Sequence, residues 1–332
     1  MNLIGEHTDY NGGLALPTIT AFRTTVTCTA RDDRRVALHT AAPVPWPTLE
    51  VDMSRLVPTR SWADHVIGVI VQLGREVGPC TIDVRSDLPA GAGLGSSAAL
   101  AVATLRALRD AFALSIDDRR IAEIAHRSET TFVGARVGRL DQIASSLGER
   151  GKALLIDFRD LGTESVALPP TVDFAVIDSG VRHEHATGAY NERRAECDAA
   201  ARALNVASLR DVRTDAWLHD LPEALRRRVR HVTSENARVR AFVRALASGE
   251  LGTLGEIVNA SHTSLRDDFQ VSLPQIDRLV TAATTSGALG ARLIGGGFGG
   301  SVLALARAGE ARTVAERAVA SAGFGRILFP TG

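Results

Sequence analysis

A glycine-rich stretch in the first third of the chain restricts the fold more than any other feature. Residues 89–98 read Pro-Ala-Gly-Ala-Gly-Leu-Gly-Ser-Ser-Ala, between a predicted strand at 81–85 and a predicted helix at 96–112. The first turn of a helix leaves backbone N–H groups unpaired, and glycine lets the backbone close around an anion. The pattern therefore predicts a phosphate-binding turn that leads from a strand into a helix.

Two common phosphate-binding motifs do not fit this stretch. A P-loop ends in Gly-Lys-Ser or Gly-Lys-Thr, and the only lysine of the chain is Lys152. The dinucleotide fingerprint requires a third glycine where Ser96 stands. The residues alone leave a structural alternative open, in which Ser96 or Ser97 caps the following helix.

The rest of the pattern predicts an α+β chain with two lobes, because strands and helices mix without regular βαβ alternation. In the first half we expect a strand pair within 14–40, helices at 62–77, 117–134 and 141–148, and a strand at 153–158. In the second half we expect a strand at 173–178, helices at 189–204, 221–229, 235–248, 251–263 and 273–287, two strands around a glycine loop at 291–306, and a closing helix and strand. Breaks at Gly162 and at Pro169-Pro170 place the lobes at 1–165 and 166–332.

The composition argues against several classes of partner. The 38 basic and 38 acidic residues cancel, so charge gives no sign of a nucleic-acid or membrane surface. No stretch reaches the ~18 apolar residues of a membrane span, and we expect no signal peptide. Cys28, Cys80 and Cys197 lack ligand-like spacing, which argues against a zinc site or disulfides and favours the cytoplasm.

The glycine-rich stretch resembles the second signature of the GHMP kinases, a superfamily named for galactokinase, homoserine kinase, mevalonate kinase and phosphomevalonate kinase. Residues 293–301, Leu-Ile-Gly-Gly-Gly-Phe-Gly-Gly-Ser, resemble the third signature. The resemblance implies an N-terminal lobe like ribosomal protein S5 domain 2, a ferredoxin-like C-terminal lobe, and an active site in the cleft between them. It also implies that ATP binds at Pro89, Gly91, Gly93, Leu94, Gly95, Ser96, Ser97 and Ala98.

The first dozen residues give the most specific resemblance. Residues 2–13, Asn-Leu-Ile-Gly-Glu-His-Thr-Asp-Tyr-Asn-Gly-Gly, resemble the galactokinase signature, and residues 261–269 also look like galactokinase. Carboxylates accept hydrogen bonds and histidine does either, so Glu6, His7 and Asp9 suit adjacent sugar hydroxyls. A metal site is the weaker alternative, because no cluster of further ligands accompanies His7.

Residues 137–142 resemble the catalytic stretch of the family. The resemblance implies Gly138 and Asp141 at the sugar, with Asp141 as the general base that takes the proton from the anomeric hydroxyl. A loose transition state asks little of a base, so Asp141 also serves to orient that hydroxyl. An N-cap role in the helix at 141–148 is compatible with both tasks.

The family resemblance assigns four further residues. Glu129 aligns with a magnesium-ligating glutamate, so Ser97 and Glu129 are the expected ligands of Mg²⁺. Tyr190 is expected at the sugar and Arg182 near the active-site anions. Trp62 matches a tryptophan of the adenine pocket.

The leading prediction is a galactokinase that transfers the γ-phosphate of ATP to O1 of α-D-galactose, as a monomer. Arg139 and Leu140 stand where small or sulfur-containing residues are usual, which leaves open a 1-kinase for N-acetylgalactosamine, arabinose or a uronic acid. A catalytically silent sugar sensor is a different alternative, and the presence of Ser97, Glu129 and Asp141 argues against it. A GHMP kinase for another substrate class is disfavoured by residues 5–9.

The chain departs from the family pattern at three other places. Leu273 and Gln275 stand where Cys and Glu are frequent, and Ser301 replaces a common Cys. The family also carries an arginine two positions before the asparagine of the first signature, whereas only Met1 precedes Asn2 here. We therefore expect a longer native N-terminus with an opening strand and this arginine, which would stabilise phosphoryl charge.

Overall fold

The computed structural model describes residues 1–42, 44–45, 47–89, 91–182, 186–213 and 220–331. The chain forms two compact units. Unit 1 comprises Met1–Ile19, Gly91–Leu94 and Glu149–Gly332, and unit 2 comprises Thr20–Ala90 and Gly95–Gly148.

These units do not coincide with the boundary expected after residue 165. β1 (Leu14–Ala15) pairs antiparallel with β6 (Lys152–Asp157), which joins the first signature to the segment of unit 1 that begins at Glu149. β6 in turn pairs antiparallel with β7 (Gly162–Ala167), giving a three-stranded sheet in the order β1-β6-β7. Gly162 therefore begins the second strand of a hairpin and does not mark a junction between lobes.

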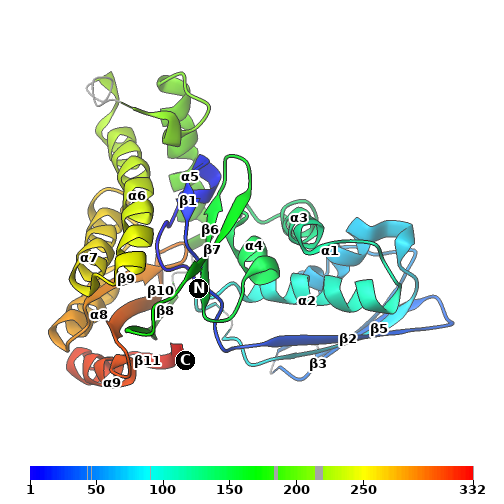
Figure 1. Ribbon diagram of the computed structural model, residues 1–332. Helices are drawn as coiled ribbons and strands as arrows, with labels where there is room; N and C mark the ends of the chain where they lie inside the picture. Colours follow the sequence, from blue (N-terminus) through cyan, green and yellow to red (C-terminus); the bar gives the residue numbers. More distant parts are fainter. Residues whose placement is uncertain (43, 46, 90, 183–185, 214–219, 332) are drawn as a thin grey trace. The chain divides into compact units, whose positions relative to one another are not determined.

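Unit 2 is built on a four-stranded sheet in the order β2-β5-β3-β4. β3 pairs parallel with β5, and the other pairs are antiparallel. The expected strand pair within 14–40 is wrong in its pairing. The chain crosses over between β3 and β5, so β5 lies between β2 and β3. The helices of unit 2 lie along one face of this sheet (Figure 1). The strands are β2 (Thr24–Ala30), β3 (Arg35–Thr40), β4 (Thr48–Asp52) and β5 (Cys80–Ser86).

The helices of unit 2 cover the sheet through a single apolar core. The sheet contributes fully buried side chains to this core, among them Leu38 and Ile82, and the helices contribute Ile67, Leu105 and Ile121. The expected helices at 62–77, 96–112, 117–134 and 141–148 are confirmed with shifted ends, and the last turns of the third are a π-helix. They are α1 (Asp64–Leu73), η2 (Gly74–Glu76), α2 (Ser96–Ala111), α3 (Asp118–Ser128), the π-helix η3 (Glu129–Val133) and α4 (Leu140–Leu147).

Unit 1 contains an antiparallel four-stranded sheet in the order β11-β8-β10-β9. Helices separate β8 from β9, and α9 (Ala311–Ala322) separates β10 from β11. This β-α-β-β-α-β succession is that of a ferredoxin-like lobe, so the expected C-terminal lobe is confirmed. Its strands are β8 (Val172–Arg182), β9 (Gly290–Ile294), β10 (Gly299–Arg307) and β11 (Arg326–Thr331).

The two helices expected at 221–229 and 235–248 form one continuous helix, α6 (Glu223–Ser248). The polar residues at its centre do not break it, because the hydroxyl of Thr233 donates to Val229 O (2.8 Å) and that of Ser234 to Arg230 O (2.6 Å). The other helices of unit 1 are η1 (Asp9–Asn11), α5 (Ala186–Ala203), η4 (Leu209–Asp211), α7 (Leu251–Asp267) and α8 (Pro274–Thr285).

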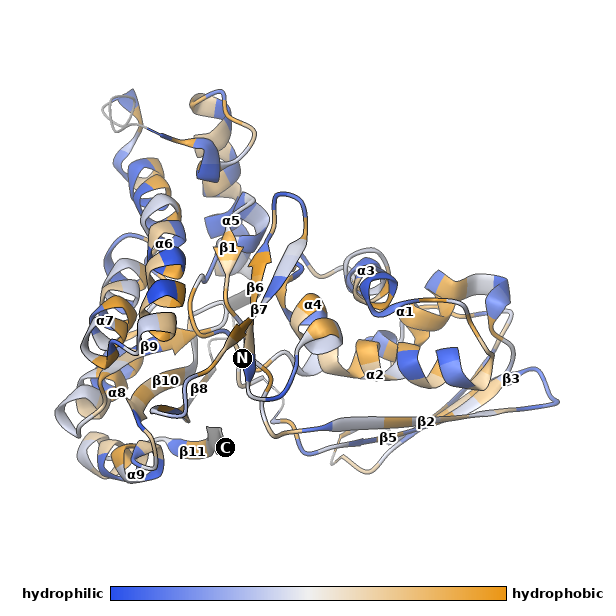
Figure 2. Cartoon of the chain, viewed as in Figure 1, coloured by the Kyte–Doolittle hydropathy of each residue, from blue (hydrophilic) through white to orange (hydrophobic). Residues whose placement is uncertain are grey.

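Hydrophilic residues interrupt the apolar ones along each helix (Figure 2). Among the described residues, no helix has the length and apolar character needed to cross a membrane.

Candidate active site

Two glycine loops of unit 1 lie directly against each other. A Cβ on Gly93 would lie 3.3 Å from the carbonyl oxygen of Ile294, and one on Gly295 would lie 3.3 Å from Cα of Gly93. The buried hydroxyl of Ser301 donates to Ala92 O at 2.8 Å. Ser301, which replaces a common cysteine, thus joins the loop of the third signature to that of the second.

A buried charge network holds the first signature in place. Oε1 of Glu6 accepts from Nη2 of Arg292 (2.7 Å) and from the backbone N–H of Gly295 (2.9 Å). Arg292 is fully buried and also donates to Asn2 O. Fully buried Glu235 accepts from the N–H of Gly5 at 3.0 Å. One oxygen of Glu6, a predicted sugar ligand, is therefore committed to holding the loop of the third signature.

His7 of the first signature has a left-handed backbone, with φ of 61°. Its Nδ1 lies 2.8 Å from the hydroxyl of Tyr10, and its buried Nε2 has no hydrogen-bond partner in the described part of the chain. Burial lowers the pKa of His7 to about 3, and nearby His231 adds to the effect. The imidazole is therefore neutral near pH 7. It retains one ring nitrogen for a ligand hydroxyl.

Tyr190, on α5, lies beside this group. The centroid of its ring lies 5.5 Å from that of His7 and 5.9 Å from that of Tyr10. A Cβ on Gly296 would lie 3.1 Å from Cδ2 of Tyr190, so a side chain at this loop position would crowd the tyrosine ring. Asp9, half-buried in the first turn of η1, accepts from the N–H of Tyr10 at 3.0 Å.

In unit 2, the start of α2 has no side-chain cap among the described residues. The N-cap is Gly95, in a left-handed conformation with φ of 71°, and no side-chain cap bond forms. The alternative in which Ser96 or Ser97 caps this helix is therefore wrong. The free N–H groups and the positive end of a 16-residue helix suit a phosphate.

Ser97 and Glu129 lie side by side, as the predicted magnesium ligands require. The Ser97 hydroxyl donates to Oε1 of Glu129 at 2.8 Å. Nε2 of Gln142 donates to the other carboxylate oxygen at 2.7 Å. Glu129 is buried and begins η3, and single π-helical turns of this kind are frequent at functional sites.

The oxygen atoms of Ser97 and Glu129 fit a magnesium ion. Because Mg²⁺ holds oxygen at about 2.0–2.1 Å in octahedral geometry, neighbouring ligands lie about 2.9 Å apart. The observed 2.8 Å matches that edge. No cluster of three or more His, Cys, Asp or Glu side chains suited to a metal occurs among the described residues. The ion would therefore complete its shell with phosphate oxygens and water.

Asp141 lies beside the end of the glycine-rich loop in unit 2. A Cβ on Gly95 would lie 3.0 Å from Cγ of Asp141, so glycine leaves space for this carboxylate. Asp141 stands in the first turn of α4, whose N-cap is Arg139, and is exposed within its unit. The N-cap role considered for Asp141 is therefore wrong.

The remaining predicted residues take simpler positions. Trp62 packs against the apolar core of unit 2 just before α1, while Pro89 and Gly138 are half-buried. Leu94 and Ala98 are buried, so their side chains serve packing. The side chain of Arg182 lies outside the described part of the structure.

Sequence reasoning missed three residues that hold the site together, Tyr10, Gln142 and Arg292. Tyr10 directly follows Asp9, and Gln142 directly follows Asp141. Their places next to predicted site residues could have indicated that they belong to the site. Arg292 directly precedes the third signature, and nothing in its local sequence indicates that it is buried.

Three family models match parts of the chain. The chain matches the model of the GHMP kinases N terminal domain over residues 64–149 and that of the GHMP kinases C terminal over residues 242–323. The Galactokinase galactose-binding signature matches residues 1–30. The chain therefore belongs to the GHMP kinases.

Similar proteins narrow the family further. The chain is 42% identical over 325 residues to a galactokinase of Roseiflexus sp. (strain RS-1), covering 94% of this chain and 83% of the relative. It is 40% identical over 339 residues to a galactokinase of Streptomyces coelicolor, covering 97% and 87%. Within the GHMP kinases, the chain belongs to the galactokinase family.

Solved structures give the same fold. Lactococcus lactis galactokinase complexed with galactose superposes with a TM-score of 0.93 at 29% identity, covering 99% of this chain and 90% of that one. A mevalonate kinase of Methanococcus jannaschii superposes with a TM-score of 0.72 at 17% identity, covering 99% of this chain and 94% of that one. The second likeness supports the fold alone.

Proposed function

We propose that this protein is a galactokinase that converts ATP and α-D-galactose into ADP and galactose 1-phosphate, with Mg²⁺ as cofactor. The observation that carries the proposal is the arrangement of the first signature. His7, whose Nε2 has no hydrogen-bond partner among the described residues, lies against the ring of Tyr190, which in turn lies against Gly296. We further propose that the protein acts as a monomer in the cytoplasm.

The residues of unit 1 that face this arrangement would hold the sugar. Nε2 of His7 and the carboxylate of Asp9 supply hydrogen-bonding groups for adjacent hydroxyls, and the ring of Tyr190 gives the sugar an apolar face. Glu6 contributes differently from the prediction, since its Oε1 is held by Arg292 and Gly295. Its main task would be to fix the position of His7.

The residues of unit 2 would hold the reacting end. The N–H groups at the start of α2 bind the phosphates, and Ser97 and Glu129 hold Mg²⁺. When bound, this ion neutralises charge on the β- and γ-phosphates.

Asp141 is the proposed base. It orients O1 of the sugar and accepts the O1 proton as the bond from O1 to the γ-phosphorus forms and the bond from that phosphorus to the ADP oxygen breaks. Asp141 is exposed within its unit and lies beside Gly95 at the start of α2, which supports this role.

The test is a panel of sugars in an assay that couples ADP release to a colour change, with the product identified by NMR. Galactose should give the highest kcat/KM and a phosphate on C1. A higher kcat/KM for N-acetylgalactosamine, arabinose or a uronic acid would replace galactose as the substrate. Binding of galactose and ATP with no ADP above background would identify a sugar sensor instead.

A further inference from the structure

One cavity of unit 1 is lined mainly by arginines. It measures about 280 Å³ and contains Arg159, Arg210, Arg213 and Arg240, with Asp211 as the single acidic residue of its lining. Arg159 lies in the turn between β6 and β7, and Arg210 and Asp211 lie in η4. Arg213 lies two positions after η4, and Arg240 lies on α6. No residue of the proposed active site takes part in it.

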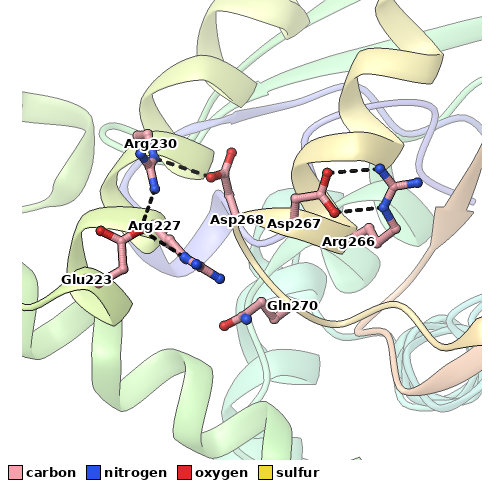
Figure 3. A pocket seen from close by; sticks show the side chains of 7 residues that line it. All are labelled: Glu223, Arg227, Arg230, Arg266, Asp267, Asp268 and Gln270. Atoms are coloured by element: carbon pink, nitrogen blue, oxygen red, sulfur yellow. Dashed lines mark hydrogen bonds and ion pairs between the residues drawn. The ribbon is translucent and has the colours of Figure 1, made fainter.

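A second cavity of unit 1 is a useful contrast, because its charges balance. It is lined by three arginines and three acidic residues, and each arginine contacts a carboxylate (Figure 3). Arg266 donates twice to Asp267, Arg227 pairs with Glu223, and Arg230 pairs with both Glu223 and Asp268. Such a cavity has no excess of positive charge for an anion.

The arginine cavity lacks this balance. Asp211 pairs with Arg159, and Arg210 pairs with Asp157 of β6. Arg213 and Arg240 have no ion pair or hydrogen bond within the described residues. Two guanidinium groups thus remain uncompensated in one concave site. Guanidinium binds phosphate through two parallel hydrogen bonds, so paired arginines favour an oxyanion.

We propose that this cavity is a binding site for a phosphate group, carried by free phosphate or by a phosphorylated metabolite, and that its occupation lowers the affinity for the sugar.

The coupling follows from two side chains that line the cavity and also hold the first signature. Nη1 of Arg210 donates to Gly12 O at 2.9 Å, and Oδ1 of buried Asn236 accepts from the N–H of Leu14 at 2.7 Å. The fit is tight, since a Cβ on Gly13 would lie 2.6 Å from that oxygen. An anion that attracts Arg210 weakens its bond to Gly12. The loop that carries His7 and Asp9 is then held less firmly.

Calorimetric titration with inorganic phosphate at low ionic strength tests the site directly. The wild-type protein is first saturated with Mg²⁺ and a non-hydrolysable ATP analogue, so that the glycine-rich loop is occupied. We expect one phosphate per chain. In an Arg213→Gln, Arg240→Gln double variant, affinity should fall at least about 10-fold, roughly 1.4 kcal/mol.

The balanced cavity supplies the matched control. Arg227→Gln removes an arginine of the balanced cavity from α6, the helix that also carries Arg240, and should leave phosphate affinity unchanged. Equal affinity in the double variant and the wild type, or no binding to the wild type, would overturn the site. A parallel titration with glycerol 3-phosphate separates the two sources. Tighter binding than that of phosphate indicates an ester, and weaker binding indicates the free ion.

The coupling rests on the proposed function and is tested separately. Galactose is titrated with and without saturating phosphate, and its Kd should rise several-fold in the wild type but not in the double variant. An unchanged Kd with phosphate bound overturns the coupling. A wild-type protein that binds no galactose refutes the proposed function, while the phosphate titration still decides the site.

Discussion

The hydroxyl of Tyr10 lies 2.8 Å from Nδ1 of His7, and this contact determines how the imidazole presents its other nitrogen. Burial raises the pKa of Tyr10 well above its usual value, so the phenol keeps its proton. The ring of Phe269, 4.5 Å from the His7 ring between centroids, supports the imidazole further. Tyr10 therefore positions His7, the proposed sugar-binding residue.

Replacing Tyr10 by Phe should raise the KM for galactose by roughly 3- to 10-fold, because a net hydrogen bond contributes about 1 kcal/mol. The ring and its packing remain, so kcat and the KM for ATP should stay near the wild-type values. Steady-state kinetics with each substrate varied measure all three. An unchanged KM for galactose would show that Tyr10 does not position His7.

The parts of the fold that repeat a local pattern were predictable, and those set by pairing between distant segments were not. The turn at 89–98 was predictable from the spacing of its glycines, and helix α2 was predictable from its many apolar residues. β5 lies between β2 and β3 because the chain crosses over after β3. The sequences of β2 and β3 carry no local signal of this crossover. The pairing of β1 with β6 likewise depends on contacts across more than a hundred residues.

The same distinction applies to the site. Ser97, Glu129, His7 and Tyr190 were recognisable because the motifs carry them. The role of Glu6 was not, because it depends on Arg292, which lies 286 positions away. The sequence around a charged residue does not show whether that residue joins a buried network or lies on the surface.

Replacing Asp141 by Ala should lower kcat by about 10²- to 10⁴-fold, because the O1 hydroxyl loses both its proton acceptor and its orientation. Nucleotide affinity, measured by calorimetry with an ATP analogue, should stay within a factor of about two, since the proposed phosphate site is the start of α2. Asp110→Ala, at an exposed position on α2, is the control. A kcat near that of the wild type would remove Asp141 as the base.

Gln142 holds the proposed magnesium ligand. Nε2 of Gln142 donates to Oε2 of Glu129 at 2.7 Å, so Gln142→Met keeps the side-chain volume but frees that carboxylate oxygen. The Mg²⁺ concentration for half-maximal rate should rise about 10-fold, in the range found for residues that orient metal ligands. Rates are measured across a magnesium series at saturating ATP and galactose. A proportional loss at every magnesium concentration would instead indicate a general loss of folded enzyme.

Arg292 is fully buried between Glu6 and Glu235, with Nη2 2.7 Å from Oε1 of Glu6 and Nη1 3.8 Å from Oε1 of Glu235. Replacing it by Met leaves two buried carboxylates without their shared cation, and should destabilise the fold by about 3–5 kcal/mol. Urea unfolding measures the change. Arg312→Met, at an exposed ion pair with Glu316, should change stability by less than about 0.5 kcal/mol.

Two buried imidazoles make stability depend on pH. Burial lowers the pKa of His7 to about 3 and that of His231 to about 4. Both are neutral in the folded protein near pH 6, while in the unfolded chain each takes up a proton near pH 6.5. The unfolded state therefore binds more protons below pH 6.5, so stability falls as the pH drops from about 6.5 toward 4, by up to about 1.4 kcal/mol per pH unit for each histidine.

His231→Gln removes one of these titrations and should reduce the slope of unfolding free energy against pH by up to about 1.4 kcal/mol per pH unit between about pH 5 and 6. The substitution lowers stability at neutral pH as well, because His231 contacts Ser264 Oγ and Glu6 O. The slope of unfolding free energy against pH separates the two effects, because lost contacts alone lower the unfolding free energy by the same amount at every pH. Equal slopes in His231→Gln and the wild type would show that His231 does not contribute to the acid sensitivity of the fold.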